Sequence, residues 1–361
     1  MRDVNNGFKS PYIFLENFLL PVNIALYSKQ YSTIPTNKEL LASGSALEDT
    51  LNSSKNGQFK LNPWFITGFV DAEGSFTISV IKDPRYKAGF RVEAIFSIAL
   101  HKKDLAILKL IQAFFGGVGN IKFETKRDVV SYVIRSKSQL AKVLFTHFDL
   151  FPLITQKRAD YILFKQAFEL ISNDAHLTLE GLKEILAIKT NLNLGLSSKL
   201  RAAFPILPSV TRLFFTDLEI PNPYWVAGFT SGEGSFYVKV SQSSSSKAGV
   251  QVQLFFYVTQ HIRDKGLLDK LISFFGAGRY HEMKGKGWAS YECSKFSDIT
   301  SKIIPFFNEY SIVGVKNLDF EAWCKIAKLM ESKSHLTTEG LAEIVKIKNG
   351  MNKLRVSDNL D

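Results

Sequence analysis

The chain has 361 residues, and its 45 lysines and arginines outweigh 34 aspartates and glutamates to give a formal net charge of +11. Only two cysteines are present, Cys293 and Cys324, without a CxxC spacing, so the sequence excludes a disulfide framework and a zinc ribbon and suits a reducing compartment. The positive charge favours a polyanionic partner, with nucleic acid as the first candidate and an anionic membrane surface as the second.

Residues 1–60 are expected to form a flexible N-terminal extension. They contain six basic and five acidic residues, so 39 basic and 29 acidic residues, a net charge of +10, fall on residues 61–361. The apolar stretch 11–27 is interrupted by Glu16, Asn17 and Pro21, which argues against a membrane span, and the acidic residues of this segment argue against an import signal. A break in composition near residue 58 suggests a fusion to a host protein that is removed later.

The rest of the chain repeats itself. Residues 61–76 (LNPWFITGFVDAEGSF) return at 220–236 (IPNPYWVAGFTSGEGSF), and Glu73 and Glu233 lie 160 residues apart. A repeat of this length suits a duplicated domain half better than a solenoid unit. The matches continue through both copies and predict a first half at 61–190, a linker at 191–220, a second half at 221–355 and a tail at 356–361.

Each half is predicted to begin with a helix, because Asn62 and Pro63 are typical of a helix N-cap and first turn, and Asn222 and Pro223 repeat them. Apolar and polar residues then alternate, which is the pattern of half-buried strands. Strands are predicted at 75–80 and 91–100, a helix at 104–115, a hairpin at 122–135, and helices from about 138 and 153. The second half repeats this order, so the fold class is α+β.

Small residues are spaced along the repeated helix. Gly68 and Ala72 are four residues apart, and so are Gly228 and Gly232, which puts each pair on one helical face. Small side chains allow two helix backbones to approach closely. We therefore expect the two copies to pack on each other with Gly68 and Gly228 at the helix interface.

Each repeated helix ends at a glutamate that is followed by a glycine. Gly74 and Gly234 are predicted to adopt the left-handed conformation common after a helix end. Glu73 and Glu233 would face the negative ends of their helix dipoles and would repel each other. A divalent cation bound between them would offset both penalties, and oxygen ligands suit Mg²⁺, with Mn²⁺ as another candidate.

The two copies differ at a neighbouring acidic position. Asp71 of the first copy is replaced by Ser231, whereas Glu73 and Glu233 are both present. If the chemistry needs one acid per half, the glutamate is that acid. Asp71 is then predicted to be a local capping or packing residue.

With these motifs in place, the chain resembles a known family. Segments 66–74 and 226–234 are similar to the two signature helices of single-chain LAGLIDADG homing endonucleases, and the resemblance covers about residues 61–355. It is closest to the group encoded in fungal mitochondrial introns. Supporting matches are Pro152 to Lys157 with Asp160, Thr259 to His261 with Asp264, and the helix starts at His176 and His335.

The resemblance implies that an αββαββα half is repeated by pseudo-twofold symmetry in a monomer. Two antiparallel, saddle-shaped sheets would lie along the major groove of double-stranded DNA. The family cuts both strands of a long asymmetric target with divalent metals and promotes intron mobility, so a mitochondrial location and no membrane partner are implied as well.

The resemblance also implies which residues hold the metals. Glu73 and Glu233 would be the metal-binding catalytic acids. The backbone carbonyls of Ala72 and Gly232 would be additional ligands.

Three further catalytic positions follow from the same comparison. Lys157 and Lys316 would lie near the scissile phosphates, and Gln260 would organise water. The counterpart of Gln260 in the first half is Leu100. The two sites are therefore expected to cut their strands at unequal rates.

DNA contacts are expected at outward strand positions, where side chains can reach base edges, and at lysines that can reach phosphates. The outward residues of the first half are Thr77, Ser79, Arg85, Arg91, Glu93 and Ser97. Those of the second half are Tyr237, Lys239, Gln251, Gln253 and Tyr257. The phosphate-binding lysines are Lys122, Lys126, Lys284 and Lys286.

Two other functions remain open on the same fold. An RNA-binding maturase that assists intron splicing need not keep either metal acid, so the presence of both Glu73 and Glu233 favours cleavage. A non-catalytic DNA-binding regulator is the second alternative, and for it a pair of acids facing phosphate would be a liability. Metal-dependent cutting of the intron-insertion sequence distinguishes the three.

Overall fold

The structure is a computed structural model that describes residues 60–216, 219–244 and 249–352; the predicted extension up to residue 59 and the tail from 356 lie outside the described residues. In the first half, a helix leads directly into two strands, as the sequence predicts. Its main elements are α3 (Pro63–Glu73), β1 (Gly74–Lys82), β2 (Phe90–His101), α4 (Leu105–Phe114), β3 (Asn120–Glu124), β4 (Val129–Ile134), α5 (Lys137–Gln139), η4 (Leu140–Phe145), α6 (Thr146–Leu150), α7 (Lys157–Ser172) and α8 (Leu179–Thr190).

The second half repeats this order after the short helix α9 (Ser198–Ala203). Its elements are α10 (Pro223–Glu233), β5 (Gly234–Gln242), β6 (Val250–His261), α11 (Lys265–Phe275), β7 (Arg279–Met283), β8 (Trp288–Cys293), α12 (Phe296–Asp298), η7 (Ile299–Ile303), α13 (Ile304–Glu309), α14 (Val315–Glu331) and α15 (Thr338–Asn349). The predicted α+β class is confirmed, and both halves contain the helix–strand–strand pattern twice.

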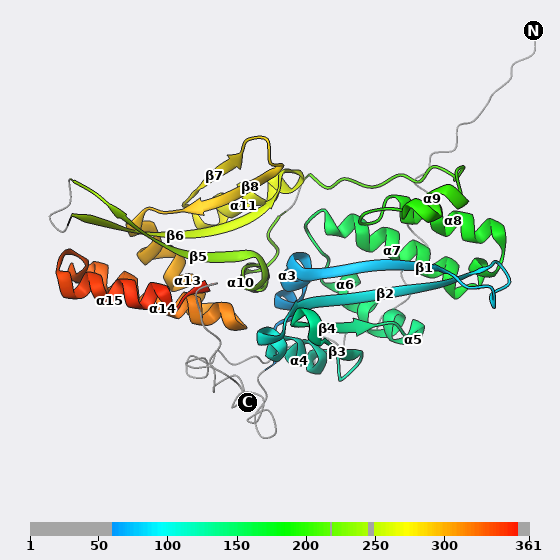
Figure 1. Ribbon diagram of the computed structural model, residues 1–361, viewed down its shortest axis with the longest axis horizontal. Coiled ribbons are helices and arrows are strands. Elements are labelled where there is room, and N and C mark those ends of the chain that lie inside the picture. Colours follow the sequence, from blue (N-terminus) through cyan, green and yellow to red (C-terminus); the bar gives the residue numbers. More distant parts are fainter. Residues whose placement is uncertain (1–59, 217–218, 245–248, 353–361) are drawn as a thin grey trace, which may run out of the picture. The chain divides into compact units, whose positions relative to one another are not determined.

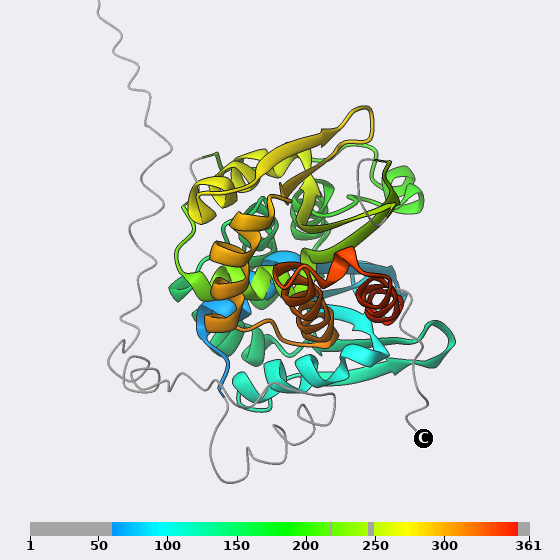
Figure 2. The same cartoon turned by 90° about the vertical axis from the view of Figure 1, so that its left-hand side faces the viewer.

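Each half contains one four-stranded antiparallel sheet. The strand orders are β1-β2-β4-β3 and β5-β6-β8-β7, so the two sheets have the same topology. The helices α3 and α10 lie between the sheets (Figure 1), and the view at right angles shows the hairpins β3–β4 and β7–β8 at opposite edges (Figure 2). Among the described residues, no helix combines the length and the apolar character needed to cross a membrane.

The core of each half fills the inner face of its sheet. Phe76 on β1 pairs with Phe96 on β2, both are fully buried, and their ring centroids are 5.3 Å apart. Phe236 and Phe256 repeat the pair at 5.2 Å in the second half. The long helix α7 packs on β1 and β2, and α14 packs on β5. The alternate side chains of the strands are therefore left on the outer faces.

Two local predictions are wrong. Gly74 and Gly234 have φ values of −71° and −70°, because each helix turns directly into an extended strand. Glycine is needed there for space: a Cβ would lie 2.8 Å from the Val70 carbonyl oxygen or 2.7 Å from that of Thr230. The helix predicted from about residue 153 begins only at Lys157, because the preceding backbone N–H groups are bound by aspartate side chains.

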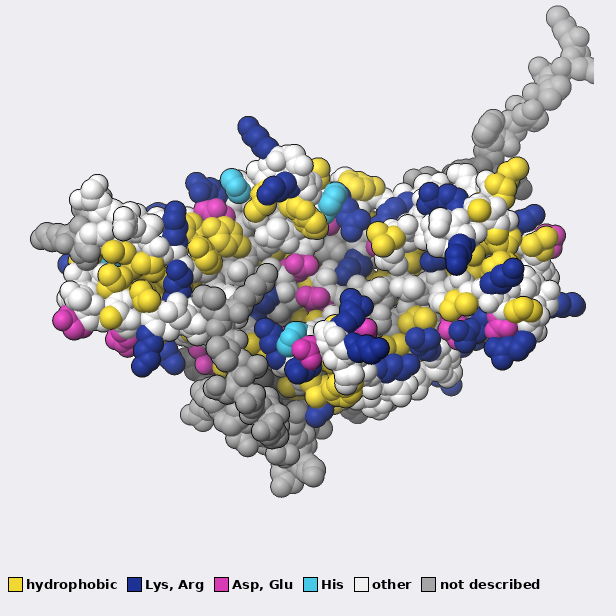
Figure 3. All heavy atoms as spheres, in the orientation of Figure 1, with side chains coloured by type: hydrophobic (Ala, Val, Ile, Leu, Met, Phe, Trp, Pro, Cys, Tyr) yellow, Lys and Arg dark blue, Asp and Glu magenta, His cyan; other side chains and the backbone are white. Residues whose placement is uncertain are grey.

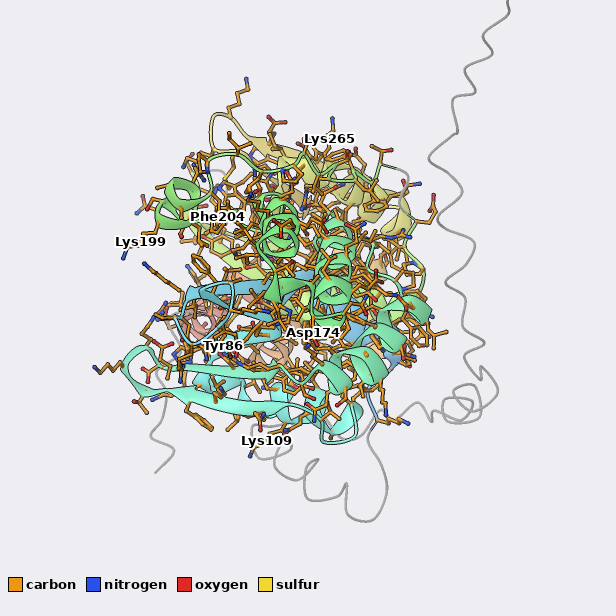
Figure 4. All side chains as sticks on the ribbon, turned by 90° about the vertical axis from the view of Figure 1, so that its right-hand side faces the viewer. Tyr86, Lys109, Asp174, Lys199, Phe204 and Lys265 are labelled. Atoms are coloured by element: carbon orange, nitrogen blue, oxygen red, sulfur yellow. The ribbon has the colours of Figure 1, made fainter. Side chains whose placement is uncertain are left out.

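The segment 191–220, predicted as a linker, is held against the first half in its described part. Arg212 donates to Asp160 on α7 at 2.5 Å, and the amide of Gln156 donates to the Phe215 carbonyl oxygen at 2.5 Å. Phe204, which follows α9 (Figure 4), packs on Phe90 of β2. The two ring centroids are 5.5 Å apart. This stretch of chain is therefore an ordered strap rather than a free tether.

Candidate active site and nucleic-acid interface

The two repeated helices pack with their backbones in direct contact. Asn62 and Asn222 cap them by accepting from the N–H groups two residues later, each at 2.9 Å. A Cβ on Gly68 would overlap the Trp225 carbonyl oxygen, and one on Gly228 would overlap that of Phe65. Both glycines therefore lie at the helix interface.

The same contact brings the C-terminal ends of α3 and α10 together. A Cβ on Gly232 would overlap the Ala72 side chain and would lie 3.3 Å from Glu73 Oε1. The small residues at 72 and 232 thus leave room for Glu73 and Glu233, which follow them. The two glutamates come from opposite halves, and their side chains lie near each other.

Both glutamates occupy an environment that disfavours their charge. Burial raises the pKa of Glu73, with Lys316 and Lys157 opposing the shift. Burial also raises the pKa of Glu233, and the charge of Glu73 raises it further, while a hydrogen bond from Gln260 lowers it. A cation would relieve this repulsion.

Two half-buried lysines lie against the helix ends. Lys157 Nζ donates to the carbonyl oxygens of Val70 at 3.1 Å and Ala72 at 3.0 Å, and Lys316 Nζ donates to the carbonyl oxygen of Gly232. Burial lowers the pKa of both amines, that of Lys316 to about 8. The carbonyls of Ala72 and Gly232 therefore already accept a hydrogen bond, although each oxygen has a second lone pair.

Asp71 is a structural residue, as its replacement by Ser231 suggests. Its buried carboxylate accepts from Ile154 N at 3.0 Å, Thr155 Oγ1 at 2.6 Å and Trp225 Nε1 at 2.9 Å. These bonds hold the chain before α7 and tie it to α10. Ser231 does the equivalent work for the second half by accepting from Val313 N at 3.1 Å.

An aspartate from each half holds the lysine-bearing helix of the other half. Asp264 Oδ1 accepts from Gln156 N at 2.9 Å, one residue before Lys157. Asp104 Oδ1 accepts from Val315 N at 3.0 Å, one residue before Lys316. Each lysine is therefore positioned by a carboxylate from across the interface.

Replacing Asp264 with alanine should lower both stability and activity, because the buried Gln156 N–H would lose its acceptor. An unsatisfied buried donor costs roughly 1–3 kcal/mol, and the start of α7 would shift with Lys157. Asparagine keeps an oxygen at the same place and should keep the bond, and because burial raises the pKa of Asp264, losing its charge should not cost stability. Melting curves and single-turnover cleavage should place wild type and Asp264→Asn above Asp264→Ala; an alanine variant equal to wild type in both would contradict this role.

A small pocket opens beside the first glutamate. Its volume is about 140 Å³, and its lining includes Glu73, Leu100, Asp104 and Lys316. It joins an acid of one half to the lysine of the other. The apolar Leu100 lines this pocket, whereas its counterpart Gln260 makes a hydrogen bond to Glu233.

The donors gathered here are those of a hard divalent cation. Within the described ranges, no group of three or more histidine, cysteine, aspartate or glutamate side chains is arranged to hold a metal. Glu73 and Glu233 would therefore supply two carboxylates, with backbone carbonyls, water and phosphate oxygens completing the shell. Oxygen donors in this number fit Mg²⁺ or a similar ion better than zinc.

Most of the predicted DNA contacts lie on the outer faces of the sheets or in turns. Cross-strand register pairs Ser79 with Glu93 and Lys239 with Gln253 on these faces. In Figure 3, a few acidic side chains lie in the middle of the face, with lysines and arginines around them. The outer-face residues are Thr77, Ser79, Arg91, Glu93 and Ser97 in the first half and Tyr237, Lys239, Gln251, Gln253 and Tyr257 in the second.

Arg85 is an exception among these predictions. It lies in the turn after β1 rather than on a strand, and it is bound to Asp83 at 2.8 Å. The predicted lysines are exposed: Lys122 is on β3, Lys126 in the turn before β4, and Lys284 and Lys286 in the β7–β8 turn. At these positions their ammonium groups could approach the sugar–phosphate backbone of a DNA duplex that runs past the edges of the sheets.

Several residues at the interface were not anticipated from the sequence. Ile95 and Phe255 also face outward, which the alternation of β2 and β6 implies once the register is fixed. Arg135 donates to Glu93 at 3.2 Å and so joins the outer face of the first sheet. The cross-half roles of Asp104 and Asp264 leave no local signal, because their partners are more than 100 residues away.

Comparison with known proteins agrees with this geometry. A family model described as LAGLIDADG endonuclease matches residues 66–168 and 226–327, one match in each half. The chain is 43% identical over 293 residues to probable intron-encoded endonuclease 3 of Neurospora crassa, covering 81% of this chain and 55% of that protein. It is 36% identical over 364 residues to probable intron-encoded endonuclease 2 of the same fungus, covering 96% and 75%. The chain thus spans only about half the length of the first of these relatives.

Solved structures give the same result. The crystal structure of the I-SmaMI LAGLIDADG homing endonuclease bound to cleaved DNA has a TM-score of 0.80 and 47% identity, covering 82% of this chain and 99% of that one. The I-LtrWI LAGLIDADG homing endonuclease bound to target DNA has a TM-score of 0.79 and 40% identity, covering 81% and 98%. Two matched motifs, paired glycine helices and duplicated sheets converge: the chain belongs to the LAGLIDADG endonuclease family.

Proposed function

We propose that this chain is a site-specific DNA endonuclease that hydrolyses one phosphodiester in each strand of a long, asymmetric target. The observation that carries the proposal is the meeting of Glu73 and Glu233 at the ends of α3 and α10, with Lys157 and Lys316 beside them. The likeness to DNA-bound homing endonucleases supports it.

The family is divalent-metal dependent, and one solved I-SmaMI complex was obtained with uncleaved DNA in the presence of calcium ions. For this chain we propose Mg²⁺, with Mn²⁺ able to substitute. When bound, such an ion supplies positive charge to the phosphate and favours hydroxide as the nucleophile. Glu73 and Glu233 would hold the ion with their carboxylates. The backbone carbonyl oxygens of Ala72 and Gly232 would be additional ligands.

The lysines would stabilise negative charge on the scissile phosphates, because each ammonium group is fixed at the end of a repeated helix. Solved I-SmaMI structures include variants in which either or both of two lysines are replaced by alanine. Those lysines are 159 residues apart in that protein, and Lys157 and Lys316 are 159 residues apart here. The spacing supports equivalent positions.

The two sites would work at different rates. Gln260 binds Glu233 and can orient a water beside it, whereas Leu100 has no polar atom to offer Glu73. Loss of an outer polar partner typically lowers activity about 10–100-fold. The strand served by the Gln260 side should therefore be cut first.

The sheets would supply recognition. Outer-face side chains of the ten strand positions named above would meet base edges, and Arg85 together with Lys122, Lys126, Lys284 and Lys286 would meet phosphate. Relatives encoded in fungal introns, and one named as a mitochondrial protein of Saccharomyces cerevisiae at 25% identity, support a mitochondrial role in intron mobility.

A plasmid that carries the intron-insertion sequence of the host gene tests the proposal. Linearisation with Mg²⁺ and none with EDTA supports an endonuclease. Tight binding without cutting would overturn it in favour of a DNA-binding regulator. Preferential binding of the intron RNA would overturn it in favour of a maturase.

A further inference from the structure

Three aromatic side chains form a contiguous cluster on the outer face of the second sheet. The rings of Phe255 and Tyr257 are stacked, with centroids 5.5 Å apart and an interplanar angle of 4°. The ring of Tyr237 lies 6.1 Å from that of Phe255 and is tilted by 45°. Tyr237 lies directly opposite Phe255 in the strand register. Its side chain is 43% exposed, and the other two are half-buried.

This aromatic cluster does not belong to the protein core. The core side chains of the same strands, Val238, Leu254 and Phe256, point to the inner face and are buried. Tyr237 is exposed and the other two rings are half-buried, so the cluster remains accessible to solvent. An aromatic cluster on a face whose other outward residues are polar is typical of a binding surface.

The first half has nothing equivalent. At the corresponding positions it carries Thr77, Ile95 and Ser97, one aliphatic side chain between two hydroxyls. The charged neighbours differ as well: Lys239 stands where the first half has Ser79, and Gln251 and Gln253 stand where it has Arg91 and Glu93. The outer face of the first half is therefore polar and charged where that of the second half carries three aromatic rings.

The major groove offers one apolar group, the C5-methyl of thymine, and side chains such as phenylalanine recognise it by contact. Given the proposed function, which this inference rests on, we infer that Tyr237, Phe255 and Tyr257 read thymine methyl groups in the half-site bound by the second half. The half-site bound by the first half is then read mainly by hydrogen bonds. Phe255 becomes a specificity-determining residue, because it has no polar atom with which to read any other base feature.

Replacing thymidine with deoxyuridine tests this directly, since it removes the methyl group and keeps every hydrogen-bonding atom. Two duplexes of the intron-insertion sequence carry deoxyuridine in one half-site or the other. Binding is measured with Ca²⁺ in place of Mg²⁺, for wild type, Phe255→Ala, Tyr237→Thr and the matched first-half control Ile95→Ala. Tyr237→Thr introduces the residue found in the first half, so it guards against misfolding of the alanine variant.

Deoxyuridine in the half-site bound by the second half should lower the affinity of wild type about fourfold for each contacted methyl group that is removed. This factor is the usual free energy of burying one such group, expressed as a ratio of affinities. Phe255→Ala and Tyr237→Thr should abolish that loss in this half-site, while Ile95→Ala leaves it unchanged. Equal loss in both half-sites, or a loss that survives both second-half variants, would overturn the inference while leaving DNA binding intact. Failure to bind the unmodified duplex would overturn the proposed function itself.

Discussion

The Glu233→Gln variant should cut its target at least about 1000-fold more slowly than wild type, which corresponds to about 4 kcal/mol of transition-state stabilisation. The same variant should melt at a higher temperature in the absence of metal. Partial burial disfavours the charged form of Glu233, and the charge of Glu73 disfavours it further. Glutamine keeps the shape and removes the repulsion, so activity and stability should move in opposite directions.

The pH dependence of this gain follows from the sign of the shift. Because folding raises the pKa of Glu233, its protonated form is favoured in the folded state. The corresponding stability is present below its ordinary value near 4.5 and is lost as pH rises through the folded-state value. The advantage of Glu233→Gln over wild type should therefore be largest at neutral pH and should vanish near pH 4.5.

Glu292 is the matched control for this prediction. It is another buried glutamate of the second half, but it has its own partner, Arg279, at 2.7 Å. Glu292→Gln should give no increase in melting temperature. Thermal melts in EDTA across pH 4.5 to 8 measure both variants; a wild-type melting temperature for Glu233→Gln would show that the paired acids do not repel each other.

Gly68→Ala should be strongly destabilising, because this glycine lies in the closest contact between the two halves. The new methyl group would overlap the Trp225 carbonyl oxygen and lie 2.9 Å from Phe229 N, and neither backbone atom can move without separating α3 from α10. Overpacking of this kind costs about 3 kcal/mol or more, which lowers the melting temperature by roughly 6–12 °C. Gly228→Ala, which meets Phe65 in the same way, should behave alike.

Gly266→Ala is the matched control. This glycine is also helical, in α11, but the nearest atom to its added methyl is Thr216 O at 3.6 Å. Because alanine is the better helix former by up to ~1 kcal/mol, this variant should be neutral or slightly more stable. If Gly68→Ala and Gly266→Ala have the same melting temperature, the close helix contact is not what holds the halves together. If Gly68→Ala melts at a lower temperature than Gly266→Ala, it should also lose cleavage activity below its own melting temperature, because Glu73 and Glu233 would separate.

The repeat made much of this molecule predictable. Comparison of two copies in one chain identifies Glu73 with Glu233 and Gly68 with Gly228 as shared, and these are the residues at which the halves meet. Period-two alternation gives the faces of β1 and β2, since Phe76 and Phe96 are buried while Ser79 and Glu93 face outward.

What the sequence leaves out is the set of contacts between halves. Each half provides an aspartate that accepts a hydrogen bond from a backbone N–H of the other half: Asp264 from Gln156, and Asp104 from Val315. No local sequence pattern specifies a partner so far along the chain. The ordered strap within 191–220 is also not predicted, in this case because its local pattern is misleading. Its composition of serine, glycine and proline is that of a flexible segment, although Arg212, Phe204 and the Phe215 carbonyl hold it against the first half.

The glycines after the helices show a different kind of error. Glutamate followed by glycine favours the left-handed helix end, but at Gly74 and Gly234 the glycine is needed because the strand leaves too close to the preceding turn. The repeated Glu-Gly pair indicates that a glycine is needed after each helix. The structure is required to decide whether the glycine is needed for a left-handed backbone conformation or because a Cβ would clash with the preceding turn.

Strand-resolved cleavage of an intron-insertion duplex, with a different label on each strand, distinguishes a metal-dependent nuclease from a protein that only binds DNA. In single-turnover reactions with Mg²⁺, wild type should cut both strands at unequal rates, Glu73→Gln and Glu233→Gln should cut neither, and Gln260→Leu should slow the faster strand about 10–100-fold. EDTA should stop every reaction. Cleavage that persists in either glutamate variant, or a duplex bound tightly and left intact by wild type, would contradict a metal-dependent nuclease site at the ends of the paired helices.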